Sequence, residues 1–287
     1  MGVRTGGADS TPGAGAAGGA AAPRGKLDVA LVQVGSGPDK AHNLQTAARF
    51  IREAAAAGAR LVVFPEMFMG VPSAERPPRA FAEPLDGPFV RGLAGEAKAA
   101  GACVVAGVWE TSDDPARPFN TAVVVEPGGR VVAAYRKLHL FDALGVRESH
   151  LMRPGSARPP VWEIDGVPLG VAICYDLRFP ELFRELAARG AEAVVVPAAW
   201  YSGTLKEEHW LALLRARAIE NTLYVLGADQ AGGPFCGRSA GFDPFGVTLG
   251  DAGEEEGLLL VHVDRARVQA VRRKLPSLQH RRTDLYG

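Results

Sequence analysis

Three reactive side chains each stand at the end of an apolar run of the sequence. Glu66 closes the run LVVFPE, Lys137 closes RVVAAYRK, and Cys174 closes VPLGVAIC. Ligand sites of α/β folds lie at strand ends, so we expect the three side chains to converge. A thiol is a nucleophile, and a buried carboxylate with a raised pKa can act as its base. An ammonium would lower the thiol pKa and stabilise an oxyanion, so the set predicts nucleophilic catalysis through a tetrahedral intermediate.

The sequence after Cys174 predicts a turn followed by a helix. Pro180 is suited to the first position of that helix, and Gly190 is suited to end it. Backbone N–H groups and the helix dipole at such a position favour a thiolate. The alternative is an ordinary core cysteine, since free Cys is among the most buried residue types.

Histidine offers a second possible base for the thiol. His139 stands two residues beyond Lys137, and His209 falls within a predicted helix. A Cys–His pair would leave the two charged strand ends without a role. Taken singly, Glu66 also fits a solvated loop and Lys137 an exposed turn, as most such residues are exposed.

Composition and charge exclude several classes of protein. Lys plus Arg and Asp plus Glu both total 32, so the net charge favours neither nucleic acid nor an anionic membrane as partner. The three cysteines form no CxxC pair, which removes zinc-site spacing and a disulfide scaffold and suits the reducing cytoplasm. No apolar run approaches the ~18 residues of a membrane span. We therefore expect a cytoplasmic protein without a metal site.

The pattern along the chain predicts one layered α/β domain over residues 26–287, preceded by a disordered Gly/Ala-rich tail over residues 1–25. Strands and helices alternate through the domain without a linker-like break. The predicted strands are 27–34, 61–66, 103–110, 121–126, 130–137, 161–165, 168–174, 193–198, 223–229, 239–243 and 258–263. The predicted helices are 39–57, 89–100, 180–190, 207–221 and 264–274.

Three ordered motifs resemble the signatures of the nitrilase superfamily, the carbon–nitrogen hydrolases. They are FPEMF around Glu66, YRKLHLF around Lys137 and ICYDLRFPEL around Cys174. The resemblance implies a triad in which Glu66 is general base and acid, Lys137 stabilises the oxyanion and Cys174 is the nucleophile. It also implies a second glutamate, matched by Glu148 in GVRESH. The implied fold is a four-layer αββα sandwich that forms a homodimer.

The branch of the superfamily is indicated by further segments. Tyr175 follows the nucleophile where nitrile-cleaving members tend to carry Trp, and CYDLRFPEL, LRARAIENTLYV and HRRTDLYG resemble omega-amidases and deaminated-glutathione amidases. Those enzymes usually carry Gly-Pro-Ala-His-Trp at the pocket, whereas this chain has GTLKEEHW over residues 203–210. The departure leaves the substrate open.

Three residues near the motifs are candidates for substrate binding. The backbone N–H of Tyr175 would hold the oxyanion, and Trp200 would line the pocket or belong to the core. The planar guanidinium of Arg178 would meet a substrate carboxylate. Alternatively, it would be a structural ion-pair partner of a carboxylate such as Asp176 or Glu181.

Together these observations predict an amidase that converts a small carboxamide to acid and ammonia through a Cys174 thioester. No metal or organic cofactor is expected. An N-carbamoyl hydrolase and a nitrilase are the alternatives within the enzyme class. A binding module on the same fold is the alternative outside it, and its sequence mark would be the loss of a triad residue.

Overall fold

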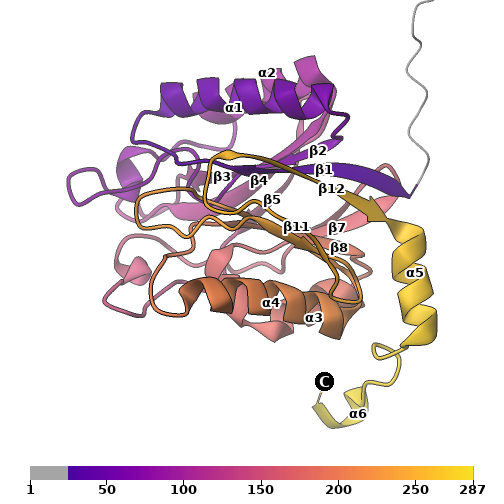
Figure 1. The fold of residues 1–287 in the computed structure, drawn as a ribbon. Helices are drawn as coiled ribbons and strands as arrows, with labels where there is room; N and C mark the ends of the chain where they lie inside the picture. The colour runs from indigo at the N-terminus through magenta and orange to yellow at the C-terminus, as the bar shows by residue number, and fades with distance from the viewer. Residues whose placement is uncertain (1–24, 287) are drawn as a thin grey trace, which may run out of the picture.

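The protein, seen here as a computed structural model of residues 25–286, has two six-stranded sheets that pack face to face (Figure 1). The first sheet has the order β12 (Gly257–Asp264), β1 (Lys26–Gln33), β2 (Leu61–Val63), β3 (Cys103–Glu110), β4 (Phe119–Val125), β5 (Val131–Arg136). The second has the order β11 (Thr248–Asp251), β10 (Ala240–Phe242), β9 (Tyr224–Asp229), β8 (Ala193–Ala198), β7 (Val167–Val171), β6 (Val161–Ile164).

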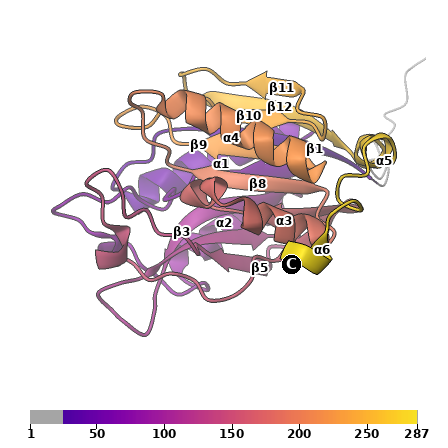
Figure 2. The same ribbon diagram turned by 90° about the horizontal axis from the view of Figure 1, so that it is seen from below.

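Helices cover the outer face of each sheet. The first sheet carries α1 (Lys40–Ala56) and α2 (Pro88–Ala100), and the second carries α3 (Pro180–Ala188) and α4 (Lys206–Asn221) (Figure 1). Seen from below, α3 and α4 lie side by side across their sheet (Figure 2). These layers confirm the four-layer αββα sandwich expected from the resemblance.

The alternation of side chains along the central strands explains why both sheet faces are apolar. In β1, Leu27, Val29 and Leu31 belong to the core between the sheets, while Ala30 and Val32 pack toward α1 and α2. Successive strand residues point to opposite faces, so a strand buried on both sides is a continuous apolar run. The β1–β2–β3 and β7–β8–β9 sets are parallel, which brings their carboxyl ends to common edges.

Several predicted elements have the bounds that the structure shows. The strands 103–110 and 193–198 are β3 and β8, and Asp39 caps α1 by accepting from the backbone N–H groups of Ala41 and His42. Pro180 is the first residue of α3, and Asp264 caps α5 (Arg265–Lys274). These signals depend only on neighbouring residues, which is why the sequence reveals them.

Two predicted strands are too long at their carboxyl ends. β2 stops at Val63, because the chain then turns toward the second sheet and the Glu66 N–H donates to the carbonyl of Ala198 at 3.3 Å. β7 stops at Val171, and Cys174 begins a 3-10 segment, Cys174–Arg178. The reactive side chains therefore stand on the turns after the strands rather than in them.

Some elements have no counterpart in the sequence prediction. These are the edge strand β11, the 3-10 turns Pro78–Ala80 and Glu148–His150, and the short helix α6 (Thr283–Tyr286). The predicted tail falls on residues 1–24, which lie outside the described residues, and on Gly25. Gly25 is held by its N–H, which donates to the carbonyl of Asp165 at 2.7 Å.

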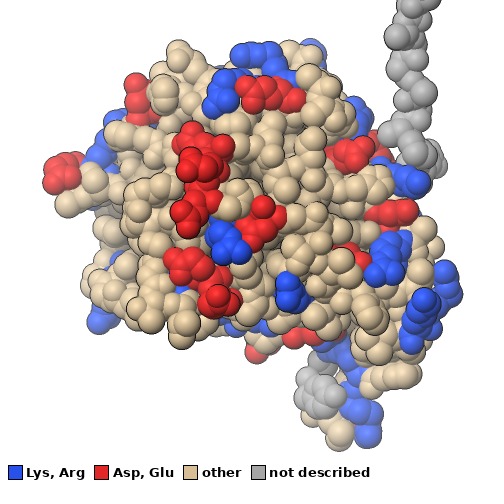
Figure 3. Space-filling view, in the orientation of Figure 1, with Lys and Arg blue, Asp and Glu red and all other residues tan. Residues whose placement is uncertain are grey.

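The surface on the face of Figure 3 carries acidic and basic side chains interspersed among other residues. Over residues 25–286, no helix has the length and apolar character needed to cross a membrane. In the same residues, no group of three or more His, Cys, Asp or Glu side chains is arranged to hold a metal ion.

Candidate active site

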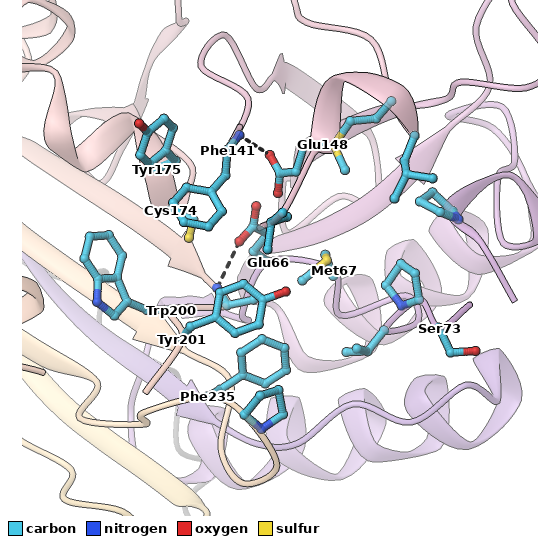
Figure 4. A pocket seen from close by; sticks show the side chains of 18 of the residues that line it. Glu66, Met67, Ser73, Phe141, Glu148, Cys174, Tyr175, Trp200, Tyr201 and Phe235 are labelled. Carbon is cyan, nitrogen blue, oxygen red and sulfur yellow. Dashed lines mark hydrogen bonds between the residues drawn. The ribbon is translucent and has the colours of Figure 1, made fainter. Parts of the chain in front are cut away.

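The residues singled out by the motifs meet at one point between the two sheets. Lys137 Nζ lies 2.8 Å from Glu66 Oε1 and 2.9 Å from Glu148 Oε2. Cys174 lines the same cavity as both glutamates, and its sulfur faces the Glu66 carboxylate (Figure 4). The structure thus brings together a thiol, two carboxylates and one ammonium from four separate segments of the chain.

Glu66 is fixed from both sheets. Gly107 in β3 permits its turn to pass closely, since a Cβ at that glycine would stand 2.7 Å from the Glu66 Cα. Asn120 Nδ2 donates to Glu66 Oε1 at 2.7 Å, and the Ala199 N–H donates to Glu66 Oε2 at 2.9 Å. Both carboxylate oxygens therefore have donors, and the side chain, only 1% exposed, has little freedom to rotate.

Lys137 is the cation that these carboxylates share. Its backbone N–H donates to the carbonyl of Asn120 at 2.9 Å, directly after β5. Glu148 is oriented toward it by the Phe141 N–H, which donates to Glu148 Oε2 at 2.7 Å. Burial alone would lower the pKa of Lys137, but the charges of Glu148 and Glu66 outweigh burial and raise this pKa well above its ordinary value. Lys137 is consequently an ammonium at neutral pH.

Cys174 has a backbone conformation that is rare for a side chain of its kind. Its φ is +43°, in the left-handed region, and such residues concentrate at functional sites. The expected placement just ahead of a helix N-terminus is corrected here, because α3 begins six residues later, at Pro180. Among the described residues the backbone N–H of Tyr175 has no acceptor, so this donor is available beside the thiol.

The thiol of Cys174 is protonated in the resting site. Burial and the Glu66 charge raise the pKa of Cys174 well above its ordinary value, although Lys137 and the Ala199 N–H act in the opposite direction. The sequence suggested that a lysine would lower this pKa, and its effect has that sign but is outweighed. A neutral thiol next to a fixed carboxylate needs that carboxylate to accept its proton during attack.

We expect iodoacetamide to alkylate Cys174 without an inflection in rate below about pH 8.5, the ordinary pKa of a free thiol. The raised pKa of Cys174 keeps the thiolate fraction small at neutral pH. Peptide mass analysis separates this product from alkylated Cys103, whose pKa burial raises to about 12. A rate plateau reached below neutral pH would instead indicate a resting thiolate paired with Lys137.

Asp176 joins the cysteine segment to the lysine segment, a role that sequence reasoning missed. Its carboxylate accepts from the Ile173 N–H at 2.9 Å, from the Tyr135 hydroxyl at 2.8 Å and from the His139 N–H at 3.1 Å. The His139 ring lies 2.7 Å from the same carboxylate and stacks on Phe179. Asp176 is fully buried, so these bonds hold the two reactive loops in one relative position.

The alternative histidine bases are placed away from the thiol. His139 is engaged with Asp176, and His209 lies 3.4 Å from a guanidinium nitrogen of Arg178. Neither histidine lines the cavity that holds Cys174. The geometry favours Glu66 over a histidine as the base.

The cavity encloses about 400 Å³, within the range of small-molecule sites. Tyr175, Trp200 and Arg178 all line it. Trp200 is also core, being 2% exposed, so both readings of that residue apply. Further lining residues that the sequence did not single out include Phe141, Tyr201, Phe235 and Lys206.

The expected structural ion pair of Arg178 is wrong. Within residues 25–286, Arg178 forms no salt bridge with Asp176 or Glu181. Asp176 is occupied by the donors described above, and the Arg178 guanidinium instead lies over the Trp200 ring, 4.8 Å from its centroid. Arg178 is thereby turned to the cavity.

Comparison with known proteins follows the geometry closely. The family model described as carbon–nitrogen hydrolase matches residues 28–273. A hydrolase of Mycobacterium tuberculosis strain H37Rv is 40% identical over 273 residues, covering 88% of this chain and 95% of the relative. The deaminated glutathione amidase of Rattus norvegicus is 38% identical over 273 residues, covering 90% and 83%.

Solved structures show the same likeness. The NitFhit protein of C. elegans has a TM-score of 0.86 and 32% identity, covering 92% of this chain and 67% of that one. An amidase from Nesterenkonia sp. has a TM-score of 0.78 and 31% identity, covering 94% and 98%. The chain belongs to the carbon–nitrogen hydrolase family, the nitrilase superfamily that its three motifs predicted.

Proposed function

We propose that the protein is a cofactor-independent amidase that hydrolyses a small carboxamide to a carboxylic acid and ammonia. The observation that carries this proposal is the buried Lys137 ammonium held between Glu66 and Glu148 beside the Cys174 thiol. This set combines a nucleophile, a base and an oxyanion stabiliser in a site largely closed to water. Such a combination is suited to acyl transfer.

In the first half-reaction, Cys174 Sγ attacks the amide carbon while Glu66 Oε accepts the thiol proton. The carbonyl electron pair moves to its oxygen, and Lys137 Nζ and the Tyr175 N–H stabilise the resulting oxyanion. The oxyanion then collapses, and the C–N bond breaks as Glu66 returns the proton to nitrogen. Ammonia leaves, and the acyl group remains on Cys174 as a thioester.

In the second half-reaction, water attacks the thioester carbon while Glu66 accepts one of its protons. The same two donors stabilise the second oxyanion, and the C–S bond breaks as the proton passes to sulfur. The acid leaves, and Cys174 and Glu66 regain their starting states. Glu148 keeps Lys137 oriented throughout, since it contacts Nζ through both carboxylate oxygens at 2.9 and 3.1 Å.

The solved relatives support the role of the cysteine. An amidase from Nesterenkonia sp. AN1, 31% identical, has been seen with the acetamide moiety of fluoroacetamide added covalently at its active-site cysteine. Several curated relatives are named deaminated glutathione amidase. These names and the Tyr175 motif favour the omega-amidase-like branch over nitrile or N-carbamoyl cleavage.

The experiment that tests this function measures ammonia release from a panel of small amides, carbamoyl amines and nitriles. We expect the amides to react fastest, with a mass increase on Cys174 equal to the acyl group in quenched samples. Turnover of nitriles or carbamoyl compounds alone would contradict the branch while retaining the triad. An inert protein with an unreactive thiol would favour the binding module instead.

We further propose that residues 26–287 form one catalytic domain acting in the cytoplasm as a homodimer. The shared core between the two sheets supports one domain, and three free buried cysteines suit a reducing compartment. The family resemblance suggests the dimer. Light scattering should then give twice the 30.2 kDa chain mass.

A further inference from the structure

The end of the cavity opposite Glu148 carries two positive side chains. Lys206 and Arg178 both line the cavity, and Lys206 is 8% exposed. Over residues 25–286, no carboxylate lies within salt-bridge distance of either side chain, and Lys206 Nζ has no hydrogen-bond acceptor. A buried ammonium without an anionic partner is costly and needs an explanation.

The local structure directs Lys206 into the cavity. It is the first residue of α4, and its carbonyl accepts from Trp200 Nε1 at 2.8 Å. Its Nζ lies 4.7 Å from the centroid of the Trp200 ring and 5.4 Å from that of Phe141. Two aromatic rings therefore flank the ammonium, as in other cation–π arrangements, and leave its N–H groups free.

Arg178 reaches the same aromatic wall from the cysteine segment. Its guanidinium lies 4.8 Å from the centroid of the Trp200 ring, so both cations stand against one indole. Burial and the charge of Arg178 together lower the pKa of Lys206. Two like charges held near each other in a confined site are a receptor for an anion, which would neutralise both.

The charges of the cavity also fix which end of a substrate lies where. Glu66 and Glu148 repel an anion from their end, while the reacting amide is neutral and is suited to Cys174. The opposite end presents an ammonium and a planar guanidinium, the two donors that pair best with a carboxylate. Aromatic side chains between them, Phe141 and Tyr175 among them, suit a short apolar spacer.

We propose that Lys206, together with Arg178, binds a carboxylate at the remote end of the substrate and so selects anionic over neutral amides. This inference rests on the proposed amidase function and adds a specificity-determining residue to it. Lys206 lies in the segment 203–210, where the sequence departs from the usual Gly-Pro-Ala-His-Trp. The altered segment thus supplies one half of the anion site.

The test compares glutaramate, which carries a carboxylate, with valeramide, its neutral counterpart of equal chain length. We expect Lys206→Met to lower the ratio of kcat/KM for glutaramate over valeramide by about 10- to 100-fold, the range for a charge-assisted hydrogen bond. Most of the loss should arise in KM for glutaramate. Lys206→Arg should restore much of the ratio, because it retains the charge.

The matched control is Lys98→Met on the exposed face of α2, which removes a lysine charge remote from the cavity and should leave the ratio at its wild-type value. An unchanged ratio in Lys206→Met would overturn the inference while leaving the amidase function intact. Calorimetric binding of glutarate tests the anion site without turnover. Equal glutarate affinity in wild type and Lys206→Met would overturn the inference even if no amide were hydrolysed.

Discussion

Replacing Cys174 by alanine is expected to lower kcat for amide hydrolysis by about 10⁴-fold or more, the scale seen when a catalytic nucleophile is removed. The alanine variant cannot form the thioester, and the base and oxyanion donors have no attacking atom to assist. The fold should persist, because the variant removes one sulfur atom beside a cavity. Ammonia release and thermal unfolding, measured on the same preparation, check both statements.

The chain offers a matched control for this variant in Cys103. That thiol is also buried, but it lies in β3 within the core between the sheets, and burial raises its pKa to about 12. Cys103→Ala should keep kcat within a few-fold of wild type. Turnover retained by Cys174→Ala, or lost equally in both variants, would refute the thioester mechanism.

Replacing Lys137 by methionine is expected to damage both activity and stability. Removing one oxyanion donor typically costs about 10²- to 10³-fold in kcat. The variant also leaves Glu66 and Glu148 buried without their shared cation, and removal of one partner of a buried pair costs about 3–5 kcal/mol in the free energy of unfolding. Steady-state kinetics and urea unfolding measure the two losses separately.

A double variant separates the two roles of Lys137. Adding Glu66→Gln to Lys137→Met removes one of the stranded charges, so the free energy of unfolding should recover in part. Activity should not recover, because the base is then missing as well. If Lys137→Met alone unfolds like the wild type, the shared-cation description of the site is wrong.

The sequence predicted the convergence of Glu66, Lys137 and Cys174 because strand ends are readable from apolar runs. Each of these runs is five or more apolar residues interrupted by few polar ones, so its end is well marked. Parallel strands then bring such ends to a common edge. Glu148 has no such signal, since it stands in a loop, and only the resemblance to the superfamily pointed to it.

The contacts that hold the loops could not be predicted in this way. Asp176 bonds to Tyr135, 41 positions earlier, and such pairings depend on how two sheets stack rather than on local pattern. For the same reason the sequence favoured an ion pair for Arg178 that the fold does not form. The positive φ of Cys174 was likewise hidden, because a cysteine in that conformation has no local signature.

The role of Lys206 was hidden for a different reason. The sequence showed an unusual segment at residues 203–210, and this departure was visible at once. Its meaning depends on Trp200 and Phe141, which surround the ammonium only in the folded chain. A departure from a family motif can therefore mark a place of interest without revealing its chemistry.

The pairing of β1 with β12 has a consequence for the order in which this chain can mature during its synthesis. β1 is the first strand to leave the ribosome, yet one of its two neighbours, β12, is built from residues 257–264 and pairs with it along eight positions. The first sheet must wait with an open edge while most of the polypeptide is translated. Contacts so distant in sequence form late and expose strand edges to misassembly. Newly made chains should thus depend on chaperones until translation is nearly complete.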